Sequence, residues 1–89
     1  MKRIIVVTTK PVNNTTEADF EALKAKEMAF IESWKASGVL ENFYIRAEKN
    51  GAVLIFKGLE TEEVIKNIEG LPFFPYMKKI EYMIFDKIF

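Results

Sequence analysis

The β-type segments of this 89-residue chain are apolar on both faces, and this feature constrains the fold more than any other. Successive side chains of a strand point to opposite faces of a sheet, so a strand with one solvated face alternates apolar and polar residues. Residues 80–85 instead carry apolar side chains on both faces, and so do residues 53–56. A sheet built from such strands must be covered on both sides.

Periodicity and turn residues predict four strands and two helices in the order β-α-β-β-α-β. The long helix is expected to begin at a capping box formed by Thr16 and Asp19 and to end at Ser37, before Gly38. Thr61 is expected to cap the short helix, and Asn50-Gly51 favours a hairpin. The strands are predicted over residues 2–9, 39–47, 52–56 and 77–85, and the helices over residues 16–37 and 62–69.

This order is typical of an α+β, ferredoxin-like domain, in which a four-stranded antiparallel sheet carries both helices on one face. Residues 1–89 are expected to form one such domain, because the chain is too short for two. Its two helices leave the other sheet face bare. The simplest cover is a second sheet packed across a two-fold axis, so we expect a homodimer or a larger homo-oligomer.

Composition excludes several kinds of partner. Thirteen basic residues balance thirteen acidic ones without charge runs, which argues against nucleic acid and anionic membranes. The chain has no Cys and no His, so we expect no disulfide, no metal and no cofactor. The first apolar run is too short for a signal peptide or a membrane span, and a cytoplasmic protein is expected.

One charged residue interrupts the apolar stripe of the long helix. At about 100° per residue, Glu27 falls at the centre of the stripe and Lys24 at its edge. A carboxylate desolvated there would be suited to proton transfer. Alternatively, Glu27 reaches solvent or forms a structural ion pair with Lys24 or Arg46. The apolar residues of the stripe are Phe20, Leu23, Phe30, Ile31 and Trp34.

Five other residues are candidates for substrate binding: Trp34, Tyr44, Arg46, Phe74 and Tyr76. Tyr44 and Arg46 share a strand face and can bind an anion, although an Arg beside a hairpin is also typical of a surface ion pair. A Trp in a helical stripe is usually a core residue. Phe74, between two prolines, is typical of either a lid or an oligomer contact.

Two segments resemble a known family. Residues 24–27 read Lys-Ala-Lys-Glu, and residues 71–77 read Leu-Pro-Phe-Phe-Pro-Tyr-Met. Both are similar to the muconolactone delta-isomerase family, in which Lys-Ala-x-Glu lies on the first helix and Leu-Pro-x-Phe-Pro-Tyr-Met precedes the last strand. The similarity spans nearly the whole chain.

The resemblance implies a dimeric α+β barrel, assembled in the family into larger rings. It also implies a cofactor-free proton shift that converts muconolactone into the enol-lactone of 3-oxoadipate. Such a reaction needs a general base and a group that stabilises the enolate. Glu27 would shuttle the proton, and Lys24 would stabilise the enolate or bind the carboxylate of a small organic acid or lactone.

The chain departs from the family pattern at two places. Ile4 occupies the position of a family His in the first strand, and Tyr44-Ile45 stands where the family has Trp-Arg, with an Arg displaced to position 46. Two other functions therefore stay open. One is a non-catalytic binding or structural dimer of the same fold, and the other is a cofactor-free oxygenase of the dimeric barrel type.

Overall fold

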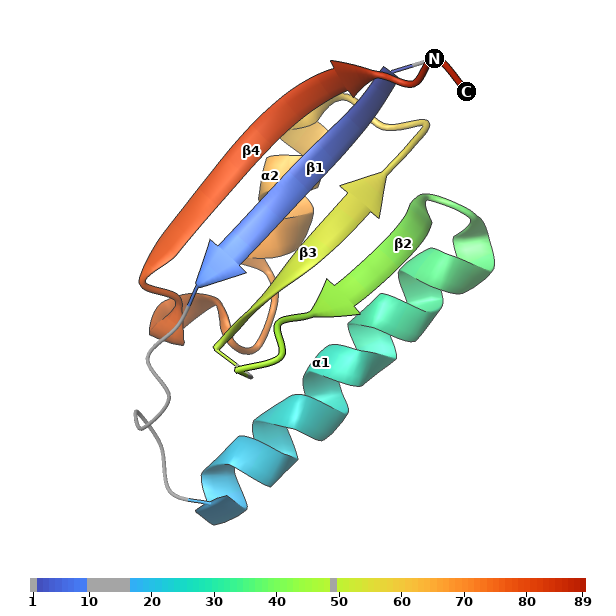
Figure 1. The fold of residues 1–89 in the computed structure, drawn as a ribbon. Helices are drawn as coiled ribbons and strands as arrows, with labels where there is room; N and C mark the ends of the chain where they lie inside the picture. Colours follow the sequence, from blue (N-terminus) through green and yellow to red (C-terminus); the bar gives the residue numbers. More distant parts are fainter. Residues whose placement is uncertain (1, 10–16, 49) are drawn as a thin grey trace.

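The structure is a computed structural model that describes residues 2–9, 17–48 and 50–89. Its elements follow the predicted order (Figure 1). They are β1 (Lys2–Thr9), α1 (Glu17–Ser37), β2 (Leu40–Ile45), β3 (Gly51–Phe56), α2 (Thr61–Glu69), the short 3-10 helix η1 (Phe74–Tyr76) and β4 (Lys79–Asp86). The ferredoxin-like βαββαβ fold is thereby confirmed.

The four strands form one antiparallel sheet in the order β2-β3-β1-β4. The first strand lies in the centre, where Ile5 is opposite Ile55 of β3 and Met83 of β4. Residues paired in this way point to the same face. The β1 register therefore defines two sets of side chains, one around Ile4 and one around Ile5.

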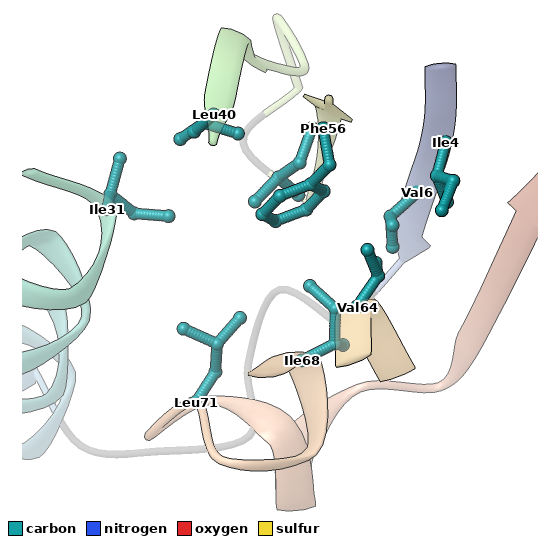
Figure 2. Close-up of a cluster of buried hydrophobic side chains, with 9 residues drawn as sticks. Ile4, Val6, Ile31, Leu40, Phe56, Val64, Ile68 and Leu71 are labelled. Carbon is teal, nitrogen blue, oxygen red and sulfur yellow. The ribbon is translucent and has the colours of Figure 1, made fainter. Parts of the chain in front are cut away.

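The set around Ile4 faces the helices and forms the core (Figure 2). Ile31 of α1 and Ile68 of α2 belong to the same buried cluster as these strand residues, so both helices pack on one face of the sheet. Phe56, on β3, is fully buried beneath them. The buried core residues are Ile4, Val6, Ile31, Leu40, Leu54, Phe56, Val64, Ile68 and Leu71.

No helix of the described residues covers the opposite face of the sheet, which we call the bare face. Its apolar side chains come from three strands and are Ile5, Val7, Val53, Ile55, Met83 and Phe85. Phe85 is 50% exposed, and Tyr44 on β2 is 56% exposed. The predicted second apolar face is thus present.

The strand β2 contains a β-bulge between Leu40 and Asn42 that was not predicted from the sequence. Beside it the Glu41 carboxylate accepts two hydrogen bonds from the guanidinium of Arg3, at 2.9 and 3.1 Å. Lys87 lies 3.7 Å from the same carboxylate. The bulge thereby lets an acidic side chain pair with a buried arginine at one end of the sheet.

The helix ends require one correction. Thr61 is the first residue of α2 rather than its cap, because the N-cap residue is Glu60. There the backbone N–H of Glu60 donates to the Glu63 carboxylate at 3.0 Å, which satisfies one of the free donors of a helix start. The predicted cap of the long helix, Thr16, lies outside the described residues.

Two further expectations are modified by the structure. Phe30, predicted to face the sheet, is 42% exposed and contacts Trp34 along the helix, with ring centroids 6.1 Å apart. The second strand is shorter than predicted, since it ends at Ile45 where the hairpin begins. The hairpin itself is present, and Arg46 N–H donates to the Gly51 carbonyl at 2.9 Å.

Candidate active site

A cavity of about 360 Å³ lies between the N-terminal half of α1 and the sheet, and we call it the helix–sheet cavity. Its helix wall comes from α1, its floor from strands β1, β2 and β3, and the remaining lining residues from the segment before β4. Its lining residues are Thr8, Phe20, Glu21, Lys24, Glu27, Met28, Phe43, Ile45, Gly51, Ala52, Phe73 and Met77. Most of this lining is apolar, as in pockets that bind small organic ligands.

Glu27 lines the helix wall and is half-buried. Its Oε1 atom accepts a hydrogen bond of 3.1 Å from the backbone N–H of Phe73, 46 residues further along the chain. This contact holds the carboxylate at the cavity lining. Arg46, one of the two basic residues considered as structural partners of Glu27, forms an ion pair with Glu48 at 3.6 Å.

Lys24 lines the same wall, three residues before Glu27 and therefore on the same side of the helix. Its side chain is exposed, so the ammonium group lies at the solvent side of the cavity. An anionic group of a ligand would meet this cation before it reached Glu27. The two residues selected from the sequence as a catalytic pair are therefore in one cavity.

The segment before β4 lines the cavity and positions Glu27. Leu71 and Phe73 are buried, and the ring of Phe73 packs on that of Phe20 with centroids 5.4 Å apart. The next residues turn through η1, which Pro75 favours by fixing its backbone angle. Met77 then reaches the cavity lining. Through Phe73, residues 71–77 therefore contact the first helix at both Phe20 and Glu27.

The sheet floor contains residues that were not predicted from the sequence to belong to the site. Thr8 is 4% exposed, and its Oγ1 accepts a hydrogen bond of 3.2 Å from Ala52 N–H. Gly51 lies so close to β1 that an added Cβ would collide with the Thr8 carbonyl oxygen. The alternation of side chains along a strand could have identified Thr8 from the sequence, because Thr8 lies on the same strand face as the core residues Ile4 and Val6.

The five residues predicted to bind substrate do not line the helix–sheet cavity. Trp34 packs on Phe56, with ring centroids 5.4 Å apart. Tyr44 lies on the bare face, on the other side of the sheet, and Arg46 forms an exposed ion pair with Glu48 at 3.6 Å.

The remaining two belong to η1. Phe74 packs against the hydrophobic core, and Tyr76 is half-buried at the end of the same turn. Ile4, at the position of the family His, is 1% exposed within the core.

Among the described residues there is no group of three or more His, Cys, Asp or Glu side chains placed to hold a metal ion. In the same part of the chain, no helix combines the length and the apolar character needed to cross a membrane. The ionisable and hydroxyl groups among the lining residues are the carboxylates of Glu21 and Glu27, the cation of Lys24 and the buried hydroxyl of Thr8. Such a set can move a proton on a small ligand and hold its oxygen atoms.

Known protein families and solved structures resemble this chain. A family model described as muconolactone delta-isomerase matches residues 2–81. The crystal structure of a muconolactone isomerase superposes with a TM-score of 0.78 at 23% identity, covering 98% of this chain and 90% of that one.

A second solved structure is 5-chloro-2-hydroxyhydroquinone dehydrochlorinase from Burkholderia phenoliruptrix, in complex with 2,5-dihydroxybenzoquinone. It superposes with a TM-score of 0.61 at 16% identity and covers 94% of this chain and 92% of that one. A comparison with curated protein sequences finds no significant match.

Proposed function

The chain belongs to the muconolactone delta-isomerase family, and from this premise we propose that it catalyses a cofactor-free proton shift on a small lactone or carbonyl acid. The observation that carries the proposal is the position of Glu27. A half-buried carboxylate, held by the Phe73 amide, faces a largely apolar cavity together with a lysine. A carboxylate in such a site is suited to general base catalysis.

In the proposed mechanism Glu27 removes a proton from a carbon that is activated by the substrate carbonyl. The electron pair of the broken C–H bond moves into the conjugated system and gives an enolate. Glu27 then returns the proton to another carbon of that system, so the double bond moves and no atom is gained or lost. On muconolactone, the proton would leave the ring carbon that bears the acetate group and return to the carbon beside the carbonyl.

Lys24 would supply the positive charge for this reaction. The substrate carboxylate and the enolate are both anionic, and a cation within a few ångströms stabilises each. Because Lys24 lies toward solvent, binding the carboxylate is its favoured role. The ring would then extend inward over apolar side chains such as Met28 and Phe43.

The proposal includes a second copy of the chain on the bare face. The apolar side chains of β1, β3 and β4 lie on neighbouring strands there, with the exposed Tyr44 and Phe85 on the same face and Glu81 opposite Val7. A contiguous apolar patch of this kind is typical of an interface, and a copy of the same sheet matches it in shape and chemistry. We propose a dimer in which two bare faces meet.

Turnover of muconolactone in D2O, followed by NMR, tests the proposed activity. We expect the wild-type protein to move the double bond and Glu27→Gln to reduce kcat about 10²- to 10⁴-fold, the usual contribution of a general base. Glu32→Gln, an exposed change on the same helix, is the matched control. Unchanged turnover in Glu27→Gln would remove Glu27 from the mechanism.

A non-catalytic binding protein is the second candidate, and the burial of Ile4 favours it. That side chain packs in the core, at the position where the family pattern has a polar His. This candidate predicts lactone binding without turnover in the wild-type protein. An oxygenase acting on an aromatic substrate would need the aromatic side chains of Trp34, Tyr44 and Tyr82 around an open cavity, and these three residues do not line the helix–sheet cavity.

A further inference from the structure

The floor of the helix–sheet cavity contains a polar group that the proposed reaction has not yet used. Thr8 is 4% exposed, yet its side chain is part of the cavity lining. It projects from the central strand β1 toward α1, on the face that also carries Ile4 and Val6. Its side chain is therefore shielded from bulk solvent and lies on the side of the sheet where the cavity is.

The hydrogen bonding of Thr8 leaves a donor for a ligand. A hydroxyl carries one proton to donate and two lone pairs that accept. Here Oγ1 accepts the Ala52 N–H at 3.2 Å, which fixes the oxygen against the sheet. Within the described part of the chain, no acceptor for the hydroxyl proton is found. A buried hydroxyl with an unused proton is costly unless a ligand or water accepts it.

Thr8 and Glu27 come from opposite sides of the cavity. Glu27 belongs to the helix wall and Thr8 to the sheet floor, and apolar residues such as Phe43 and Met28 lie among them in the lining. A flat ring that enters the cavity would have the carboxylate on one side and the hydroxyl on the other. Lys24, exposed at the same helix wall, would remain free to bind a carboxylate outside the ring.

We propose that the Thr8 hydroxyl donates a hydrogen bond to the carbonyl oxygen of the substrate and to the enolate that forms from it. This inference rests on the proposed function and names the group that recognises the carbonyl. As the proton leaves, negative charge grows on that oxygen, so the hydrogen bond strengthens toward the transition state. Thr8 thereby selects carbonyl-bearing rings over rings of the same shape that lack an acceptor.

Binding of two non-reactive ligands tests the proposal independently of turnover. The saturated lactone analogue of muconolactone keeps the carbonyl, and the corresponding cyclic ether keeps the ring and the carboxylate but lacks the carbonyl. Titration calorimetry of wild type, Thr8→Val and Thr8→Ser would give the affinity of each ligand. Thr9→Val is the matched control, because Thr9 points to the other face of the same strand.

We expect Thr8→Val to weaken lactone binding about 10-fold and leave ether binding unchanged, whereas Thr8→Ser and Thr9→Val bind both ligands as wild type does. In the turnover assay, Thr8→Val should lower kcat about 100-fold, in the range seen when one donor to an oxyanion is removed. Thr8→Ser should restore most of that loss.

Thr8→Val also removes the acceptor of Ala52 N–H, so thermal unfolding is measured alongside binding. A lower melting temperature with unchanged lactone affinity of the folded protein would show a purely structural threonine and overturn the proposal. If the wild-type protein turned over no lactone but still bound it through Thr8, the proposed reaction would fail while the recognition stood. If Glu27→Gln were inactive and Thr8→Val fully active, the proposed reaction would stand and the proposed role of Thr8 would fail.

Discussion

The backbone N–H of Phe73 donates a hydrogen bond of 3.1 Å to Oε1 of Glu27, and so joins the first helix to the segment before the last strand. The ring of Phe73 adds a contact with Phe20, about two helical turns before Glu27. Two segments that are characteristic of the family, residues 24–27 and 71–77, are thus directly connected. In this chain, the second segment holds the carboxylate that the first one carries.

The Glu27 contact predicts different stabilities for two substitutions. Glu27→Gln keeps an oxygen that accepts the Phe73 N–H, whereas Glu27→Ala leaves that half-buried donor without this acceptor. We expect Glu27→Ala to lower the free energy of unfolding by about 1–3 kcal/mol and Glu27→Gln by much less. Urea unfolding of both variants measures the difference. Equal stabilities would mean that the hydrogen bond is absent in solution.

Lys24→Met is predicted to weaken binding of anionic substrates. The substitution keeps most of the aliphatic side chain and removes the charge at the mouth of the cavity. We expect KM for a lactone acid to rise about 10-fold, with little change for the neutral methyl ester. Lys26→Met, an equally exposed change two residues along the helix, serves as the control. A similar KM increase in both variants would indicate general electrostatics instead of a specific contact.

The ion pair of Arg3 and Glu41 predicts a dependence of stability on pH. The hydrogen bond and charge of Arg3 lower the pKa of Glu41 below its ordinary value of 4.5. The pair therefore contributes its full stability above the pKa of the unfolded chain, and this contribution is lost as the pH falls through the lower folded pKa.

Thermal unfolding at several pH values checks this expectation. Wild type should lose more stability than Glu41→Gln as the pH is lowered from about 6 to about 3. Exposed Glu32→Gln should follow the wild-type curve. Parallel curves for wild type and Glu41→Gln would show that the pair does not contribute.

The proposed dimer is tested at Ile5, which lies on the central strand between Ile55 and Met83. A carboxylate at this position stays partly solvated in one protomer but is buried without a partner when two bare faces meet. We expect Ile5→Glu to raise the dimer dissociation constant at least about 100-fold. Sedimentation velocity measures the change.

Ile84→Glu is the matched control for this test, since Ile84 is 55% exposed on the opposite face of the sheet. It should dimerise as wild type does. A shift to monomer in Ile84→Glu alone would place the interface on the helix side, and a monomeric wild-type protein would contradict the proposed dimer altogether.

The sequence by itself was sufficient for the order of the elements and for the two apolar faces of the sheet. Both follow from local periodicity, which is the same whatever the rest of the chain does. The β1 strand has the predicted bounds, and the interruption of the helical stripe at Glu27 was visible for the same reason. These are properties of neighbouring residues.

The tertiary structure decided which polar groups share a cavity. Thr8, Glu27 and Phe73 are distant in the chain and meet only because β1 pairs with β3 and the segment before β4 packs on α1. Strand register also placed Tyr44 on the bare face, away from the cavity, because a shift of one residue along a strand moves a side chain to the opposite face of the sheet. Such long-range choices depend on the packing of the whole domain, which no local pattern encodes.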